Sequence, residues 1–312
     1  MSKSKICACV LTIFFAAPLA LATSTEITLD CLADICQFME SAIFDVVVEY
    51  QTYYDPPPNL EDIAGTDNVF QKGRAKHIWA WATAESFTPG PFVERSKSTK
   101  KVTVMNELGD SWDSEITQSY NGEVAKRHQL DGWPNKLSRG TITKKRDFMP
   151  NRSVTPLGFT VLRFKEKPLS ERLREKDSVR LDNTIKTVNG FKTIHVDLFV
   201  RWKDKEIFSK RVYFSADHMF TPVKIEYFSG KGKVALAVEV FELEKVAEAL
   251  WFPKKGRLAP SVPGRRAYIY EASKILVNQG LTDEYFDIKF PPGTKVYDEI
   301  KDREYVVKPA NK

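Results

Sequence analysis

The chain has little of what metal or cofactor chemistry requires. Its 312 residues include only 4 cysteines and 4 histidines. The histidines His77, His128, His195 and His218 lie far apart in the sequence, whereas a structural zinc site needs Cys and His ligands at short, regular spacing. The sequence therefore predicts no metal site, and nothing in it indicates another cofactor.

The loops that mark common enzyme classes are missing as well. The G-x-S-x-G turn of the α/β-hydrolases does not occur. Gly230 and Gly232 lie between two predicted strands and predict a hairpin, because a phosphate-binding loop opens a helix. Glu239 and Glu242 are a carboxylate pair suited to acid–base chemistry, but their place on a strand and at its end favours a solvated outer face. We expect a protein that is not an enzyme; a secreted hydrolase is the alternative.

Long apolar runs are absent beyond the N-terminus. There, Lys3 and Lys5 precede the apolar run 6–17, and Ala20-Leu21-Ala22 has the small-x-small pattern of a signal-peptidase site. The run is shorter than the ~20 residues that cross a bilayer, which disfavours the alternative of a signal anchor. We predict a signal peptide over residues 1–22, cleaved after Ala22, and an exported chain that is soluble and at most peripheral to a membrane.

The excess of positive charge is small. Lysine and arginine total 47 and acidic residues 41, a net charge of +6, and loss of the two signal-peptide lysines leaves 6 − 2 = +4. The basic runs 97–101, 144–146, 254–257 and 265–266 lie at predicted turns or strand ends, where solvated charge is the simplest interpretation. This distribution argues against a nucleic-acid partner. Attraction to anionic lipid headgroups is the weaker functional alternative.

Two cysteines, Cys31 and Cys36, remain in the exported chain. An oxidising compartment permits a disulfide between them. Five residues of a regular helix rise ~7.5 Å, however, and bridged cysteines have Cα atoms less than ~7 Å apart. The spacing favours two core thiols and leaves the disulfide open.

One long helix is expected near the start of the exported chain. Thr28 and Asp30 are typical of a helix start, and apolar residues then recur at helical spacing. The pattern predicts a helix over 28–41. The residues on its apolar face are Leu32, Ile35, Cys36, Met39 and Ile43.

Strands and turns make up most of the rest. Apolar and polar residues alternate over 44–51, and Pro56-Pro57-Pro58 ends that strand. The polar segment 59–74 predicts a loop, 151–158 a turn-rich interruption, and 169–175 a short helix. Asn121-Gly122 and Asp131-Gly132 suit hairpin turns. Further strands are expected over 78–83, 92–95, 101–107, 114–120, 124–130, 140–144, 194–202, 208–214, 223–227, 234–240, 250–253, 266–277 and 285–290, followed by a polar tail.

The strands of the second half share one apolar face, as in an antiparallel meander. Strands do not alternate with long helices, which excludes a doubly wound parallel fold, so the predicted class is mainly β (α+β). One long helix is too little to cover so broad a face. The sheet must therefore curve around something, and an apolar concavity is the natural site for a hydrophobic ligand; the alternative is a sheet fully packed on its own helix and loops. Candidate cavity residues are Val46, Val48, Tyr50, Val196, Leu198, Val200, Ile225, Val238 and Val240.

Two segments carry a family resemblance. The first runs from Thr221-Pro222-Val223-Lys224-Ile225-Glu226-Tyr227 through the Gly230 hairpin to Trp251-Phe252-Pro253, and the second is the ending 282–300. With the order of the predicted elements, they resemble the LolA/LolB/RseB-like proteins, and the ending is similar to that of LolA-like secreted proteins of planctomycete-type bacteria. The chain departs from a simple carrier in its extra middle residues, and the positions by which carriers exchange lipoprotein are not matched.

The resemblance implies a curved antiparallel sheet that forms an open half-barrel, with an N-terminal helix and short helices at its mouth. It implies a single LolA-like β domain over 23–312 in the periplasm, whose cavity holds a lipid or lipoprotein acyl chain non-covalently. The alternative that it implies is an RseB-like sensor module that docks an envelope protein. Fold alone does not decide between these tasks.

Overall fold

The computed structural model describes most of the chain after the predicted signal peptide. The predicted cleavage after Ala22, the triple proline at 56–58 and the turn-rich segment 151–158 lie outside the described residues. The described ranges are 27–43, 45–55, 69–80, 95–105, 111–121, 123–132, 136–144, 163–164, 167–203, 205–261 and 266–309.

The predicted N-terminal helix is confirmed as α2 (Leu29–Ala42). Thr28 is its N-cap, and the Thr28 hydroxyl accepts a hydrogen bond from the backbone N–H of Cys31 at 3.2 Å. This bond satisfies one of the N–H groups left without a partner at a helix start. Leu32 and Cys36 of the predicted apolar face are buried, together with Ala33, whereas Ile35 and Met39 are half-buried.

Fifteen strands join in one sheet, which runs in the order β17-β16-β6-β5-β4-β3-β2-β1-β15-β14-β13-β12-β11-β10-β9. All neighbours pair antiparallel except β16 with β6. The strands are β1 (Asp45–Asp55), β2 (Val69–Ala80), β3 (Arg95–Met105), β4 (Ser111–Tyr120), β5 (Ala125–Asp131), β6 (Leu137–Thr143), β9 (Val179–Val188), β10 (Phe191–Trp202), β11 (Lys205–Ser215), β12 (Thr221–Phe228), β13 (Val234–Ala247), β14 (Leu250–Pro260), β15 (Ala267–Val277), β16 (Lys295–Asp298) and β17 (Arg303–Val306).

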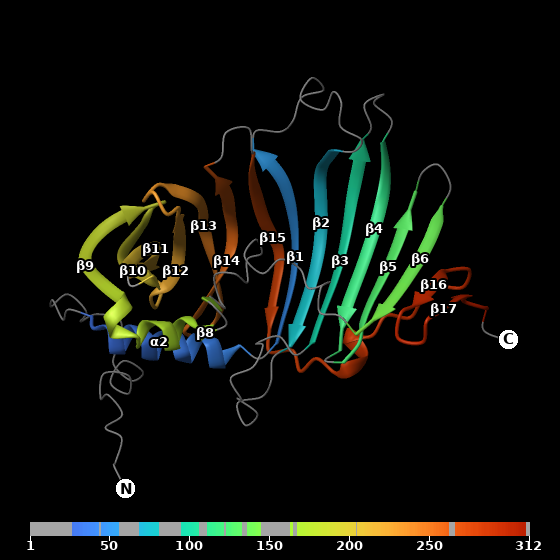
Figure 1. Ribbon diagram of the computed structural model, residues 1–312, viewed down its shortest axis with the longest axis horizontal. Helices are drawn as coiled ribbons and strands as arrows, with labels where there is room; N and C mark the ends of the chain where they lie inside the picture. Colours follow the sequence, from blue (N-terminus) through green and yellow to red (C-terminus); the bar gives the residue numbers. More distant parts are fainter. Residues whose placement is uncertain are drawn as a thin grey trace, which may run out of the picture.

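The sheet is open and curved. Its outermost strands in the described chain, β17 and β9, do not pair with each other, and β9 to β13 curl at one end above α2 while β1 to β6 form a broader row (Figure 1). The predicted fold class, a mainly β antiparallel half-barrel with an N-terminal helix, is therefore confirmed. The shorter elements are β7 (Arg163–Phe164), β8 (Lys167–Pro168), α3 (Leu169–Leu173), η5 (Lys176–Ser178) and η6 (Asp283–Phe286).

Several strand predictions were wrong at polar segments. The expected loop 59–74 overlaps β2, which begins at Val69. Of the strand expected over 92–95 only Arg95 is described, and it begins β3, which also contains residues 101–105 of the strand expected over 101–107. β3 lies between β2 and β4 and pairs with both, so its backbone is satisfied although its side chains do not alternate. The expected strand 285–290 is the turn η6 followed by an unpaired extended segment, and β9, β16 and β17 were missed.

The segment after β15 crosses the sheet on the face opposite α2. Phe286 is fully buried beside Val47, whose side chain points away from its neighbours Val46 and Val48 because strand residues alternate. Farther along, Lys97 Nζ donates to the carbonyl oxygen of Asp287 at 3.0 Å. The C-terminal segment thus covers strands that the helices do not reach.

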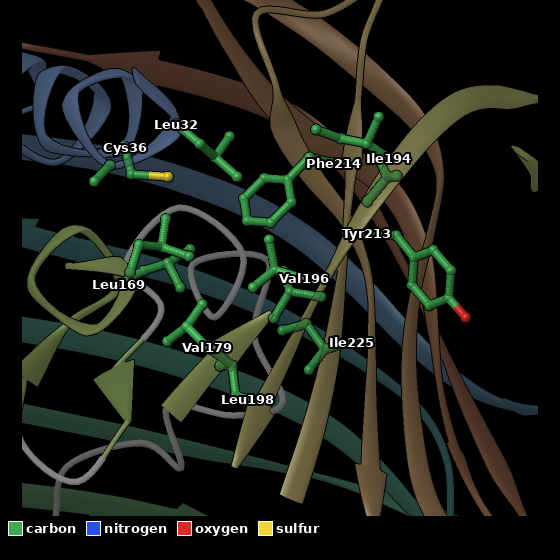
Figure 2. Close-up of a cluster of buried hydrophobic side chains, with 14 of the residues drawn as sticks. Leu32, Cys36, Leu169, Val179, Ile194, Val196, Leu198, Tyr213, Phe214 and Ile225 are labelled. Carbon is green, nitrogen blue, oxygen red and sulfur yellow. The ribbon is translucent and has the colours of Figure 1, made fainter. Parts of the chain in front are cut away.

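The same outer face carries a network of charged and polar side chains over β9 to β14. Tyr213 points to this side, away from the apolar cluster (Figure 2). The outer-face network is bonded strand to strand, and its members are Asp182, His195, Asp197, Arg211, Tyr213, Lys224, Glu226, Glu239 and Arg257.

Glu239 corrects an expectation from the sequence. Its side chain is not on a solvated face: the residue is only 7% exposed. Arg257 Nη2 lies 2.6 Å from Glu239 Oε2, and Lys224 Nζ lies 3.4 Å from Glu239 Oε1. The two cations come from neighbouring strands and compensate the buried carboxylate, whereas Glu242 is exposed and pairs with Lys254 at 3.1 Å.

His195 is the most buried titratable member of this network, at 4% exposure. Its Nε2 lies 3.5 Å from Asp182 Oδ2 and 4.0 Å from Asp197 Oδ1. Arg211, which binds Asp197 through two hydrogen bonds of 2.6 and 2.8 Å, opposes a positive charge on the ring. Burial first, and then Arg211, lower the pKa of His195.

Replacement of Gly256 is expected to destabilise the sheet. A Cβ at this position would lie 2.3 Å from the carbonyl oxygen of Glu239 and 2.5 Å from the Tyr270 ring, so we expect Gly256→Ala to lower the free energy of unfolding by about 2 kcal/mol. Urea unfolding followed by circular dichroism measures this. Gly230→Ala is the matched control, since nothing lies within 4 Å of its Cβ, and an equal loss in both variants would contradict the packing argument.

The stability of the protein should fall as pH drops below about 6.5, the pKa of an unperturbed histidine. Because the pKa of His195 is lowered in the folded state, the unfolded chain takes up the proton first, and unfolding becomes more favourable in acid. His128 and His218, whose pKa values burial also lowers, add to the effect. The test is urea unfolding at pH 7.5 and pH 5.5: His195→Gln should show a smaller drop than the unchanged protein, and an unaltered drop would refute the role of His195.

Candidate ligand-binding face

Eight of the nine residues predicted to line a cavity belong to two buried clusters, and the ninth, Val200, belongs to neither. Eight of them are buried, and Val200 is half-buried. Val196, Leu198, Ile225, Val238 and Val240 belong to one cluster. Val46, Val48 and Tyr50 belong to the other.

The first cluster, here named the helix-capped core, is closed by α2 and α3. Leu32 and Cys36 point from α2, and Leu169 from α3, toward the strand residues Val196 and Phe214 (Figure 2). The core consists of Leu32, Ala33, Cys36, Leu169, Leu173, Val179, Ile194, Val196, Leu198, Val212, Phe214, Val223, Ile225, Val238 and Val240, and Tyr213 of the outer face contacts it. The apolar face of β10 to β13 is therefore packed against α2 and α3.

Polar bonds fix the two helices to each other. The backbone N–H of Ser170 donates to Glu40 Oε1 at 3.0 Å, and the Ser170 hydroxyl donates to the other oxygen of the same carboxylate. Arg174 of the turn after α3 donates to Asp34 at 2.5 Å and to Gln37 at 2.9 Å. Burial raises the pKa of Glu40. The cover is therefore a specifically bonded pair of helices.

Cys36 lies within the helix-capped core, and Cys31 is half-buried on the same helix. The two sulfurs are not bridged to each other. The disulfide that the sequence left open is therefore absent, because α2 is regular over this stretch and holds the two residues more than a helical turn apart. Burial raises the pKa of the Cys36 thiol, which keeps it protonated.

The second cluster contains a buried hydroxyl without a hydrogen bond. Tyr270 packs with Tyr50 and Phe252, and within the described chain its hydroxyl oxygen has no partner. Burial raises the pKa of Tyr270 and of Tyr50. Gly256 leaves the space that the Tyr270 ring occupies, so the ring is tightly held.

A groove of about 1050 Å³ opens where the helix cover ends. It lies between α3 with η5, the start of β9, and the paired ends of β10 and β11. Its apolar lining is Leu198, Phe199 and Val200, and Leu198 also belongs to the helix-capped core. The polar lining comes from Arg172, Glu175, Asp177, Ser178, Arg180, Arg201, Glu206, Ser209 and Lys210.

Hydrogen bonds hold the charged lining in place. Arg172 donates to Ser178 Oγ at 2.7 Å and also to the carboxylate of Glu175 and the carbonyl oxygen of Phe199, and burial lowers its pKa. The guanidinium of Arg180 lies 4.2 Å from the centre of the Phe199 ring. The groove thus has apolar residues and charged side chains in one lining, an arrangement suited to an amphipathic molecule.

Sequence reasoning found part of this groove. Leu198 and Val200 were predicted from the alternation along β10. The charged lining from 172–180 was missed, because it reaches β10 and β11 only through the folded position of α3, η5 and β9. The one available signal was the dense run of charges over 171–177, which nothing in the sequence tied to the strand.

Neither α2 nor the shorter helical turns of the described chain have the length and apolar composition of a membrane-spanning helix. Within the same residues, no three His, Cys, Asp or Glu side chains gather so as to hold a metal ion.

Comparison with known proteins places the chain near several solved structures. A model of a family described only as "Uncharacterized protein" matches residues 163–290, less than half of the 312 residues, and no curated protein matches. A DUF1329 family protein from Desulfovibrio piger is 11% identical, with a TM-score of 0.46 over 83% of this chain and 97% of that one. A putative outer membrane lipoprotein-sorting protein domain from Vibrio parahaemolyticus is 9% identical, with a TM-score of 0.43 over 83% and 97%.

A LolA superfamily protein from Nitrosomonas europaea is 11% identical, with a TM-score of 0.40 over 84% of this chain and 98% of that one. Two of these neighbours thus bear the names of the group that the C-terminal motifs of this chain resemble. At these TM-scores and identities, the likenesses carry no argument about the ligand or the task of the chain.

Proposed function

We propose that the protein is exported to the periplasm and binds a lipid or lipoprotein acyl chain non-covalently, as a carrier. The observation that carries this proposal is the groove, in which Leu198, Phe199 and Val200 meet a ring of bonded charges. Such a site removes apolar surface of a ligand from water, which contributes about 0.8 kcal/mol for each buried CH₂ group. The charges at its rim suit a polar headgroup or peptide.

The proposal assigns different parts to the nine candidate residues. Leu198 and Val200 line the groove, and Val200, which is half-buried whereas Leu198 is only 2% exposed, would make the direct contact with the acyl chain. The other candidates are packed against helices or against β14 and β15. They would contact an acyl chain only if α2 and α3 moved off the sheet and the chain took their place. The Glu40–Ser170 and Asp34–Arg174 bonds join the two helices to each other, so such a movement would carry the helices as a pair.

Export and the domain boundary belong to the same proposal. The signal peptide over residues 1–22 is removed after Ala22, and residues 23–312 act as one LolA-like unit that binds its ligand and catalyses no reaction. N-terminal sequencing of the protein from a periplasmic extract tests the cleavage site, and a start at Met1 would contradict it.

Acyl binding should depend on Val200. We expect the exported protein to bind a fluorescent fatty acid, and Val200→Glu to weaken that binding at least tenfold, because a carboxylate would face the apolar part of the ligand. Fluorescence titration measures the dissociation constant. Ile185→Glu, at a residue that is 57% exposed and does not line the groove, is the control and should bind normally. No binding by the unchanged protein, together with no lipid in native mass spectra, would refute the proposal.

The second candidate is an interaction module that docks an envelope protein. The observation that favours it is Ile185, exposed in the middle of the edge strand β9. Addition of a partner strand is hindered there, because residues 183–185 bulge opposite a single residue of β10. Docking would therefore use side chains of β9.

The two candidates give opposite results with the same two variants. If the protein docks a partner through β9, an affinity-tagged chain should retain a specific envelope protein, Ile185→Glu should lose at least nine-tenths of it, and Val200→Glu should keep it. Quantitative mass spectrometry of the retained proteins measures this. Equal retention by all three chains would exclude docking at β9.

A further inference from the structure

We propose that one edge of the sheet docks onto an anionic lipid bilayer. The surface, here named the hairpin face, is formed by the β10–β11 and β12–β13 hairpins. Its members are all solvent-exposed and consist of five cations and one tryptophan: Arg201, Trp202, Lys203, Lys205, Lys231 and Lys233.

The two hairpins project side by side from the same edge. β11 pairs with β10 on one side and β12 on the other. Trp202 pairs with Lys205 at the tip of the first hairpin, and Phe228 pairs with Val234 at the base of the second. Because consecutive antiparallel strands reverse direction, alternate turns lie at one edge.

Three aromatic rings on β10, β11 and β12 pack next to the hairpin face. The rings of Phe208 and Phe228 are stacked with centroids 4.1 Å apart, and the Phe199 ring lies 5.4 Å from that of Phe208. The stack joins the two hairpins through side chains of β10, β11 and β12. Trp202 lies beyond it and is 65% exposed, an unusual place for a large aromatic side chain in a soluble protein.

The positive charges of the hairpin face favour an anionic partner. The second hairpin, Ser229 to Lys233, has no acidic residue. In the first, Glu206 is already bound by Arg180 at 2.5 Å, and Lys203 and Lys205 flank Asp204 in the sequence. Each Lys or Arg close to an anionic leaflet strengthens binding roughly fivefold, and tryptophan favours the headgroup level of a bilayer. Lysines spread around an exposed tryptophan therefore fit a lipid surface.

Docking at this edge would bring the groove to the membrane. Arg201 belongs to the hairpin face and also lines the groove, next to Val200. A protein held by the hairpin face would have its groove open at the level of the lipid headgroups. The docking itself does not depend on cargo, so it stands or falls separately from the proposed carrier function.

Vesicle co-sedimentation tests the docking. The purified protein is mixed with vesicles of phosphatidylethanolamine and phosphatidylglycerol at 3:1, or of phosphatidylcholine alone, at 0.1 M and 0.5 M salt. We expect binding to the anionic vesicles that weakens at the higher salt. The triple variant Lys205→Gln, Lys231→Gln, Lys233→Gln should bind at least tenfold more weakly, and Trp202→Ala several-fold more weakly.

A matched control removes three charges from the far end of the molecule: Lys289→Gln, Lys301→Gln and Lys308→Gln, all at exposed positions. It should bind anionic vesicles as the unchanged protein does. Equal binding to phosphatidylcholine, or equal losses in the two triple variants, would overturn the proposal. Titration of the hairpin-face variant with the fluorescent fatty acid should give the unchanged affinity, which separates failure of docking from failure of acyl binding.

Discussion

The packing of α2 and α3 against the apolar face of β10 to β13 is the interaction on which the rest of the structure depends. A sheet with one apolar face cannot leave that face in water, and Leu32, Cys36 and Leu169 of the helices pack against it. These apolar contacts hold the helices on the sheet, and the bonds from Ser170 to Glu40 and from Arg174 to Asp34 hold the two helices to each other. The strongest curl of the sheet, from β9 to β13, is where this cover lies (Figure 1).

The limits of that cover position the candidate site. α2 has 14 residues and α3 only 5, and together they do not reach the ends of β10 and β11. At the end of the helix cover, Leu198 belongs both to the packed core and to the lining of the groove. Arg172 of α3 adds a charged side chain to the same groove. The groove therefore forms at the border of the helix-capped core, because β10 continues beyond the helices and leaves Val200 without a helix over it.

The opposite face is stabilised differently in the two halves of the sheet. Over β9 to β14, charges from successive strands neutralise one another, as Lys224 and Arg257 do for Glu239. Over β1 to β6, the segment after β15 lies across the strands, with Phe286 buried beside Val47. Lys126 also forms an ion pair of 2.5 Å with Asp287 of that segment, so the covering segment is held by both apolar and charged contacts.

The sequence by itself determined α2 and the strands β10 to β13 and β15, because an apolar period reports directly that one face is buried. It also identified Leu198 and Val200. Only the tertiary structure decided what covers that face: Val196 and Val200 look alike along the chain, yet one is packed under a helix and the other lines a groove. The first half of β3, the strands β9 and β16, and the partners of Glu239 were likewise beyond prediction, since backbone pairing and charge compensation come from residues far away in sequence.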